Sequence, residues 1–269
     1  MPIPEPDQEP LTVLNPAAID LWLIATDTVE PPVLASLQSA LSAEEQAHLQ
    51  PRRLPAAQRN MALSRGCLRY LLSHYTGQAP SSLRFAYGPR GKPELASSHH
   101  GPASAYQGLA FNLSHSGARL LIGVGAASAV KAIGVDLEEL RDLKQLSGLC
   151  RRCLTPAEAA TVLALDHPQA DHRFLRYWTG KEACLKALGL GIVDSMQSLE
   201  LTLAPTEPTE VPAVMAVATD GLQHPGRLYQ WRPTAGFVAA IAVQSDSHHP
   251  TFQLRQTTPA ALVEKAFSY

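Results

Sequence analysis

The sequence predicts an α+β protein made of two halves with a similar order of elements. Two observations carry this prediction: short apolar runs of strand length recur along the chain, and each half also contains a long stretch with helical character. The chain has 269 residues, of which 45% are hydrophobic, enough to build a core in each half. We expect the halves to span residues 1–127 and 128–269, although no sequence repeat relates them.

In the first half, the longest predicted helix runs from about residue 55 to 75, where Gly77 ends it. It carries an apolar stripe, with its arginines Arg59, Arg65 and Arg69 lying largely off the stripe. A shorter helix is expected around 33–41. Strands are predicted at 21–25 and 83–87, and a hairpin at 111–115 and 120–126.

The second half opens with a predicted strand at 133–137. Thr155-Pro156-Ala157-Glu158 has the pattern of a capping box with proline at the first helical position, so a helix should begin there. A longer helix from about 170 to 188 should end at Gly189. The remaining strands are predicted at 199–203, 214–218, 227–231 and 237–243. From Ser245 onward the chain should be peripheral, with a short helix at 259–267.

Two acidic motifs indicate a metal and phosphate site. Asp136 and Glu138 are two residues apart on a strand and therefore share one of its faces. Glu182 and Lys186 are one helical turn apart and share one face of a helix. Brought together, these side chains offer hard oxygen ligands for magnesium and a cation for a phosphate ester. Each motif alone is also typical of an ordinary solvated surface, so their combination carries the prediction.

The motifs occur in an ordered set. Gly91-Lys92-Pro93 is followed by Phe111-Asn112-Leu113-Ser114-His115-Ser116-Gly117, then by Gly134-Val135-Asp136-Leu137-Glu138 and by Trp178-x-x-Lys181-Glu182-x-x-x-Lys186. Over roughly residues 41–242, this set resembles the double signature of the Sfp-type 4'-phosphopantetheinyl transferases. The resemblance implies an internal pseudo-twofold between the halves and a monomeric enzyme.

The resemblance also implies a reaction and a set of site residues. The enzyme would move the 4'-phosphopantetheine group of coenzyme A to a serine of an apo acyl or peptidyl carrier protein, with Mg²⁺ (or Mn²⁺), releasing 3',5'-ADP. The implied metal ligands are Asp136, Glu138 and Glu182, and the catalytic residues are Glu182 and Lys186. The implied coenzyme-binding residues are Arg59, Arg65, Lys92, Ser114, His115 and Lys186.

Residues around these motifs are expected at the surface, in the packing of the helix or in protein docking. Lys181 points about 100° away from Glu182 around the helix and is expected at the surface or at a phosphate on the rim. Trp178 is expected to pack the helix. The segment from Arg141 to Arg152 holds four basic residues, which would form a docking surface for an acidic carrier protein. Those basic residues are Arg141, Lys144, Arg151 and Arg152.

Bulk properties exclude several other classes. A net charge of −2 gives no overall attraction to nucleic acid or an anionic membrane. No apolar run approaches the roughly 20 residues of a membrane span, and residues 1–10 lack the pattern of a signal peptide, so we expect a cytoplasmic protein. Four cysteines are too few for a disulfide scaffold, and Cys150 and Cys153 are expected to be unpaired thiols near a loop.

Two alternative functions use the same residues. One is a magnesium-dependent phosphoester hydrolase that needs no protein acceptor; the other is a non-catalytic module that only binds coenzyme A. There is no Walker A loop, and Gly123-x-Gly125 lacks the third glycine of a dinucleotide-binding fingerprint. Release of 3',5'-ADP that depends on carrier protein would separate a transferase from both alternatives.

Overall fold

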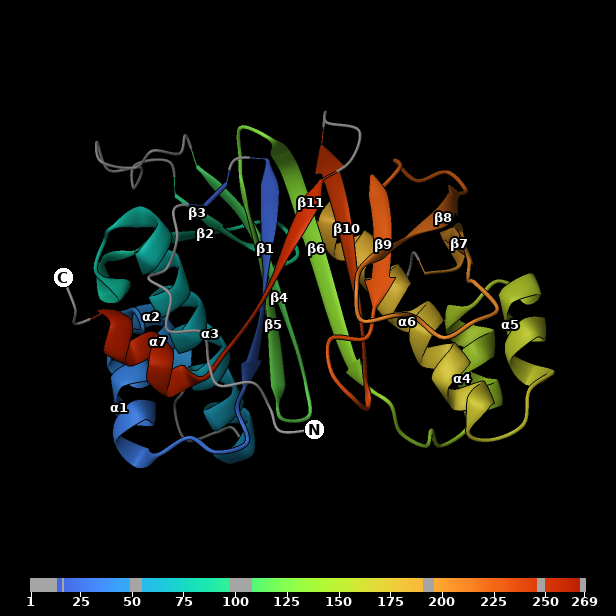
Figure 1. Cartoon of the computed structure of the whole chain (residues 1–269), viewed down its shortest axis with the longest axis horizontal. Coiled ribbons are helices and arrows are strands. Elements are labelled where there is room, and N and C mark those ends of the chain that lie inside the picture. Colours follow the sequence, from blue (N-terminus) through green and yellow to red (C-terminus); the bar gives the residue numbers. More distant parts are fainter. Residues whose placement is uncertain are drawn as a thin grey trace.

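The computed structural model describes residues 14–15, 17–48, 55–96, 108–190, 196–245 and 250–266. The predicted absence of a signal peptide in residues 1–10 therefore falls outside the described residues. Two β-sheets occupy the middle of the molecule, and a group of helices covers the outer side of each sheet (Figure 1). Within the part of the chain that the structure describes, no helix has both the length and the apolar character needed to cross a membrane.

The first sheet has the strand order β11-β1-β5-β4, in which β1 is antiparallel to β5 and parallel to β11. Its strands are β1 (Ala18–Ala25), β4 (Leu109–Ser116), β5 (Arg119–Ala126) and β11 (Thr251–Thr257). Its helices are α1 (Pro31–Ser39), α2 (Ala43–His48), α3 (Pro55–Thr76) and α7 (Pro259–Ala266). A 3₁₀ turn η1 (Pro80–Ser82) leads into a small separate hairpin of β2 (Phe85–Tyr87) and β3 (Pro93–Leu95).

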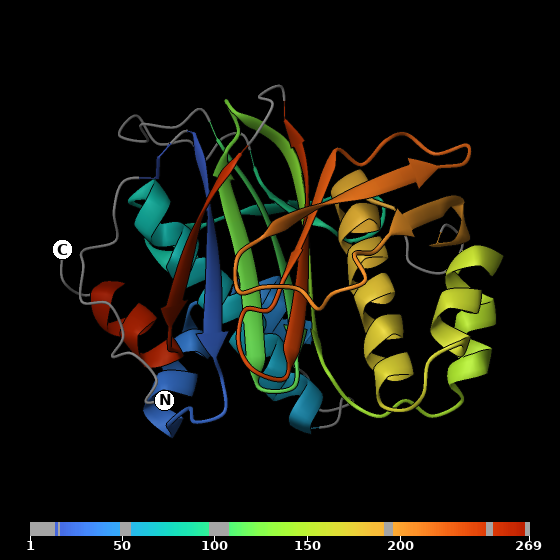
Figure 2. The same ribbon diagram turned by 45° about the vertical axis from the view of Figure 1, so that its right-hand side comes forward.

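The second sheet has the order β6-β10-β9-β8-β7. Its strands are β6 (Val130–Glu139), β7 (Leu199–Thr202), β8 (Ala213–Thr219), β9 (Arg227–Trp231) and β10 (Phe237–Ser245). The helices of this half are α4 (Leu146–Cys153), α5 (Pro156–Leu163) and α6 (Gln169–Leu188), with a 3₁₀ turn η3 (Met196–Ser198) before β7. Figure 2 shows α6 running alongside the second sheet, with α4 and α5 on its far side.

The two halves repeat one topology, which confirms the predicted α+β fold with two similar halves. In each half the first strand, β1 or β6, is followed by a long helix and then pairs antiparallel with a later strand, β5 or β10. The strand order β1-β5-β4 therefore corresponds to β6-β10-β9. Two halves related by a pseudo-twofold axis should connect their strands in the same order, and these halves do. Their sequences nevertheless show no obvious repeat.

Strand alternation divides the core into layers. Odd-numbered residues of β1 and β6, such as Leu21 and Val135, pack between the two sheets. The alternate residues of β1, such as Trp22 and Ile24, face the helices of the first half instead. A separate core lies between α6 and the second sheet. The strands β1, β5, β6 and β10 are thus covered on both faces, and the edge strands β4 and β6 of the two sheets lie against each other.

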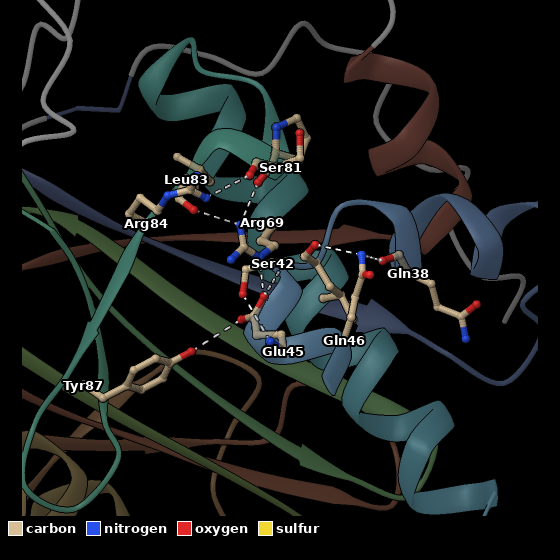
Figure 3. Close-up of polar contacts among 11 residues, drawn as sticks. Gln38, Ser42, Glu45, Gln46, Arg69, Ser81, Leu83, Arg84 and Tyr87 are labelled. Carbon is tan, nitrogen blue, oxygen red and sulfur yellow. Dashed lines mark hydrogen bonds and ion pairs between the residues drawn. The ribbon is translucent and has the colours of Figure 1, made fainter. Parts of the chain in front are cut away.

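A buried ion pair on each long helix repeats the plan at the level of side chains. Arg69 of α3 pairs with Glu45 of α2 at 2.7 Å, and Lys181 of α6 pairs with Glu158 of α5 at 2.5 Å. We call them the Arg69–Glu45 clamp and the Lys181–Glu158 clamp. Arg69 also donates to the carbonyl oxygen of Leu83 (Figure 3) and to that of Pro80. The predicted positions of Arg69 off the apolar stripe and of Lys181 at the surface are therefore wrong.

Both clamp glutamates belong to capping boxes. Glu158 accepts the backbone N–H of Thr155 and donates its own N–H to the Thr155 hydroxyl, which confirms the predicted box. Glu45 and Ser42 exchange the same two bonds at the start of α2 (Figure 3). The error about the two cations has a physical reason: a cation on a helix can be buried only when a carboxylate from another element meets it, and helical periodicity does not reveal such a partner.

The C-terminal segment is a structural part of the first half, so its predicted peripheral position is wrong. β11 extends the first sheet beside β1, and α7, which confirms the short helix predicted there, buries Leu262 against the core of that half. The buried Asp20 of β1 pairs with Arg255 of β11 at 3.3 Å. An apolar-pattern search misses such a strand because its side chains are half exposed and polar.

Other local predictions are confirmed. Both long helices end at a glycine in the left-handed region, Gly77 with φ 67° and Gly189 with φ 69°. Trp178 packs against the core of the second half and stacks on Phe174. Cys150 and Cys153 are free thiols as predicted; both are buried, and Cys153 is the last residue of α4, directly before the connection to α5.

Candidate active site

The site forms where the edge strand β4 of the first sheet meets the edge strand β6 of the second, with α6 lying against β6. Asn112 of β4 accepts the backbone N–H of Val135 at 2.9 Å and so joins the two edges. Gly134 allows α6 to approach: a Cβ atom there would overlap the carbonyl oxygen of Ala183 and the backbone nitrogen of Ala187. Glycine at this position thus brings the helix motif against the strand motif.

Asp136 and Lys186 form the centre of the cluster. The Lys186 ammonium lies 2.7 Å from Asp136 Oδ1 and 3.6 Å from Glu182 Oε2. It also donates to the carbonyl oxygen of Val135 at 3.1 Å and to the Ser114 hydroxyl at 3.2 Å. Ser114 in turn donates to Asp136 Oδ1 at 2.8 Å. The structure therefore brings together the strand acid, the helix acid and the lysine that the two sequence motifs contain.

Burial dominates the electrostatics of this cluster. Burial, and after it the charge of Asp136, raises the pKa of Glu182 to about 7. Burial likewise raises the pKa of Asp136, although Lys186 opposes this effect. Burial by itself lowers the pKa of Lys186, but the two carboxylates outweigh it and raise that pKa above its ordinary value. The cluster holds more negative charge than one ammonium neutralises, which favours a further cation.

Glu138 is turned toward a second set of partners. Its Oε2 accepts the Ser116 hydroxyl at 3.0 Å and forms an ion pair with the half-exposed Arg141 at 2.8 Å. Its charge still contributes to the raised pKa of both Asp136 and Glu182. Glu138 is therefore near the other two acids but lies at the outer edge of the cluster, where its carboxylate connects the cluster to Arg141.

The donor set fits a cation that prefers oxygen ligands. Oδ2 of Asp136 is buried and, among the described residues, has no hydrogen-bond partner, which leaves it open to a ligand. The only trio of His, Cys, Asp or Glu in the described residues whose ligand atoms all lie within 4.8 Å of one another is Asp142, His167 and Asp171. Asp136, Glu138 and Glu182 are thus more widely spread, with the Lys186 ammonium between Asp136 and Glu182.

A cavity of about 640 Å³ adjoins the carboxylate cluster and has a cationic wall. Lys186 belongs both to the cluster and to the lining of this cavity. Three more of the predicted coenzyme-binding residues line it: Arg65, Lys92 and His115. The lining also includes Asn60, Met61, Ser64, Arg90, Gly91, Asn112 and Leu190.

The predicted coenzyme-binding residues differ in how available they are. Nη1 of the Arg65 guanidinium is buried and has no hydrogen-bond partner among the described residues, while the guanidinium lies over the Tyr87 ring. Lys92 instead donates to the carbonyl oxygens of Ile133 at 2.9 Å and Lys186 at 2.8 Å, and burial lowers its pKa. Arg59 is not among the described residues that line the cavity, and it donates to the Thr26 carbonyl at 3.4 Å.

Several residues of the site were not predicted as functional. Asn112 joins β4 to β6, Ser116 holds Glu138, and Asn60, Ser64 and Arg90 line the cavity. Asn112 and Ser116 lie inside the Phe111–Gly117 motif, and Arg90 lies directly before Gly91-Lys92-Pro93. Their places in or beside the motifs are the sequence signal that could have identified these three residues. Asn60 and Ser64 are four residues apart on α3, and only the cavity distinguishes them from ordinary polar helix residues.

Comparisons with known proteins match this arrangement. Residues 132–242 match the family model of the 4'-phosphopantetheinyl transferase superfamily. The 4'-phosphopantetheinyl transferase HetI of Nostoc sp. is 36% identical over 250 residues, covering 93% of this chain and 96% of that protein. The chain belongs to the 4'-phosphopantetheinyl transferase superfamily. The matched range of the family model contains both acidic motifs of the site.

Other members of the superfamily align over shorter stretches. A putative 4'-phosphopantetheinyl transferase of Synechocystis sp. is 35% identical over 172 residues, covering 64% of this chain and 65% of that protein. The crystal structure of Thermotoga maritima holo-[acyl-carrier-protein] synthase covers 43% of this chain and 63% of that one, at 18% identity and a TM-score of 0.32.

Proposed function

We propose that this protein transfers the 4'-phosphopantetheine group of coenzyme A to a serine of an apo carrier protein. The observation that carries the proposal is the double position of Lys186, which pairs with Asp136 and also lines the 640 Å³ cavity. One side chain thereby connects a carboxylate cluster suited to a metal with a cavity large enough for a coenzyme. Membership of the superfamily supports the same reaction.

Coenzyme A carries a pyrophosphate and a 3'-phosphate, and the cavity wall offers cations for both. We place the 3'-phosphate on Arg65 and His115, since Nη1 of Arg65 has no acceptor among the described residues and a guanidinium suits phosphate oxygens. Arg59 and Ser114 are weaker candidates because Arg59 lies outside the lining and Ser114 is bonded to Asp136. Lys92 gives two of its three ammonium donors to backbone carbonyls, and we assign the third to a phosphate oxygen in the cavity that it lines.

We propose that Asp136, Glu182 and Glu138 hold Mg²⁺, or Mn²⁺ in its place. The open Oδ2 of Asp136 and the raised pKa of Glu182 both suit a hard divalent cation. The ion, when bound, would neutralise charge on the pyrophosphate. Glu138 would contribute from the edge of the cluster, where it now bonds Ser116 and Arg141.

The protein side chains have defined tasks in this reaction. The serine oxygen of the carrier attacks the β-phosphorus of coenzyme A, the bond from that phosphorus to the bridging oxygen breaks, and 3',5'-ADP leaves. We assign the serine proton to Glu182, whose carboxylate lies beside the Lys186 ammonium at the proposed phosphate site. Lys186 stabilises the negative charge that develops on the phosphate oxygens.

The carrier protein would dock on a basic surface beside the cluster. Arg151 and Arg152 are exposed in the last turn of α4, and Lys144 is exposed in the segment before it. Arg141 connects this surface to the cluster through Glu138. An acidic carrier would therefore meet positive charge close to the proposed phosphate site, despite the negative charge of the whole chain.

The test is a transfer assay with coenzyme A, Mg²⁺ and a panel of apo carrier proteins, followed by intact mass spectrometry. We expect at least one carrier to gain the mass of one phosphopantetheine group, and 3',5'-ADP to appear only when carrier is present. Release of nucleotide without carrier would identify a hydrolase instead. Tight coenzyme binding without either product would identify a binding module.

A further inference from the structure

The Lys181–Glu158 clamp joins five elements around the helix that carries the proposed catalytic residues. The Lys181 ammonium contacts Glu158 Oε2 at 2.5 Å and donates to the carbonyl oxygens of Met196 at 2.9 Å and Cys153 at 3.2 Å. Glu158 also accepts the backbone N–H groups of Thr155 and Leu201, each at 2.8 Å. One ion pair therefore ties α6 to α4, α5, η3 and β7.

Every donor of this buried cation is satisfied. The Lys181 side chain is 0% exposed and that of Glu158 is 2% exposed. An ammonium has three N–H donors, and the three oxygen acceptors around Lys181 account for all of them. A rotation or shift of α6 would break these bonds within a dry core, where an unpaired charge is very costly. The clamp thus restricts both the rotation and the position of the helix along its axis.

Glu182 follows Lys181 directly, and Lys186 lies one turn further along α6. On the side of α6 opposite Lys181, the backbone of Ala183 and Ala187 lies against Gly134 of β6, where no Cβ separates helix and strand. Helix α6 is therefore held from two sides. A small rotation would move the Glu182 carboxylate and the Lys186 ammonium away from Asp136, which does not move with the helix.

We infer that the Lys181–Glu158 clamp is a positioning device that sets α6 so that Glu182 and Lys186 face Asp136. Among the described residues, no hydrogen bond or ion pair joins either clamp side chain to the carboxylate cluster, so the effect is exerted through the helix backbone. The inference rests on the proposed transfer reaction for its catalytic consequence. Its structural consequence, the geometry of a divalent-cation site, is measurable without coenzyme or carrier protein.

The molecule supplies a matched control. The Arg69–Glu45 clamp has the same construction in the first half: a capping-box glutamate, a buried cation on the long helix and two carbonyl acceptors. Its side chains are 2% and 6% exposed, close to the values of the other clamp. No member of the carboxylate cluster lies on α3 or α2.

The experiment compares four variants: K181M, K181M/E158Q, R69M and R69M/E45Q. Breaking one partner of a buried pair leaves an uncompensated charge, whereas removing both charges does not. We therefore expect each single variant to lower the melting temperature and each double variant to recover most of the loss. Should K181M fail to fold, the double variant carries the test.

The deciding measurement is Mg²⁺ affinity of the free protein by titration calorimetry. We expect K181M/E158Q to bind Mg²⁺ at least about tenfold more weakly than wild type, the lower end of what support groups around a metal site contribute. The kcat for transfer should fall similarly while the KM for coenzyme A stays within about twofold. R69M/E45Q should keep the wild-type Mg²⁺ affinity.

Two outcomes would overturn the inference. One is K181M/E158Q regaining both its melting temperature and its Mg²⁺ affinity, which would make the clamp a stability element only. The other is R69M/E45Q weakening Mg²⁺ binding equally, which would show a general loosening. If wild type binds Mg²⁺ but modifies no carrier, the proposed function fails, and the calorimetry still decides the role of the clamp.

Discussion

The long helices α3 and α6 follow one plan and serve different purposes. On each, a buried cation meets the glutamate of a capping box at the start of a short preceding helix. Each helix then ends at a left-handed glycine eight residues after that cation, Gly77 after Arg69 and Gly189 after Lys181. The repeat is visible in contacts that the sequence alone does not align.

The positions that follow the cation make the difference. In α6 they hold Glu182 and Lys186, which face the carboxylate of Asp136. The corresponding positions of α3, counted from the cation, hold Tyr70 and His74. The Tyr70 hydroxyl donates to the carbonyl of Ser36, and burial lowers the pKa of His74. Two halves with one topology therefore differ in a few side chains: the second half holds the carboxylate cluster, and the first half contributes Arg65 to the cavity wall.

Removal of the Asp136 carboxylate should lower the transfer activity more than any other change in either half. Asp136→Asn keeps the size of the side chain but removes the charge that pairs with Lys186. We expect kcat/KM for transfer to fall by about 10³-fold, the upper end of the loss from removing one charge-stabilising group. The measurement is initial rate of carrier modification, with circular dichroism as the control for folding. Activity within tenfold of wild type would contradict the central role of this acid.

Glu182→Gln should lower kcat by about 10²-fold, since it removes the proposed proton acceptor. Turnover unchanged at saturating Mg²⁺ would show that Glu182 is not the base.

The same variant tests the electrostatics of the cluster. The pKa of Glu182 is about 7 in the folded protein against an ordinary value of 4.5, so the folded state retains a proton that the unfolded state releases between these values.

Metal-free wild type should therefore lose stability as the pH rises from about 4.5 through about 7, because the folded state binds more protons in this range. Thermal unfolding across that range measures the slope. Glu182→Gln should reduce it, and so should added Mg²⁺, because the ion replaces the proton as the neutralising charge. Identical slopes for wild type and variant would contradict the assigned pKa.

Loss of either clamp should lower the free energy of unfolding by a similar amount, although only the Lys181–Glu158 clamp should affect Mg²⁺ binding. R69M and K181M each leave a buried glutamate without its cation. We expect each to lower the free energy of unfolding by about 3–5 kcal/mol. Denaturant titration measures both values. A difference of several kcal/mol between the two variants would mean that the two halves depend on their clamps to different degrees.

The smallest effect is expected at the proposed docking surface. Replacing Arg151 and Arg152 by glutamate should raise the KM for carrier protein several-fold and make it less sensitive to salt, while the KM for coenzyme A stays unchanged. Both residues are exposed, so folding should not change. An unchanged carrier KM would place docking elsewhere. We expect no carrier docking on the first half, so charge reversal of exposed residues there is the control.

The sequence allowed prediction of most elements and of the centre of the site. Strands at 111–115, 133–137 and 227–231 and the helix ending at Gly189 all appear where local patterns placed them. Asp136, Glu182 and Lys186 meet as the two motifs predicted. Periodicity succeeds here because each motif lies on one regular element, whose geometry fixes which residues share a face.

Predictions failed where a residue depends on a partner from a distant element. Arg69 and Lys181 are buried because Glu45 and Glu158 meet them, and β11 belongs to the first sheet because β1 lies beside it. Lys92, predicted for phosphate binding, lines the cavity and also donates to two backbone carbonyls of the other half. No local pattern encodes these pairings.

By itself, then, the sequence determined the kinds of element, their order, and which acids and lysines share a face. Local backbone geometry is sufficient for that, since it acts within a few residues. The tertiary structure decided which faces meet: β4 against β6, α6 against Gly134, and each clamp cation against its glutamate. Burial then raised the pKa of Asp136 and Glu182, because desolvation depends on everything packed around a group and not on its neighbours in the chain.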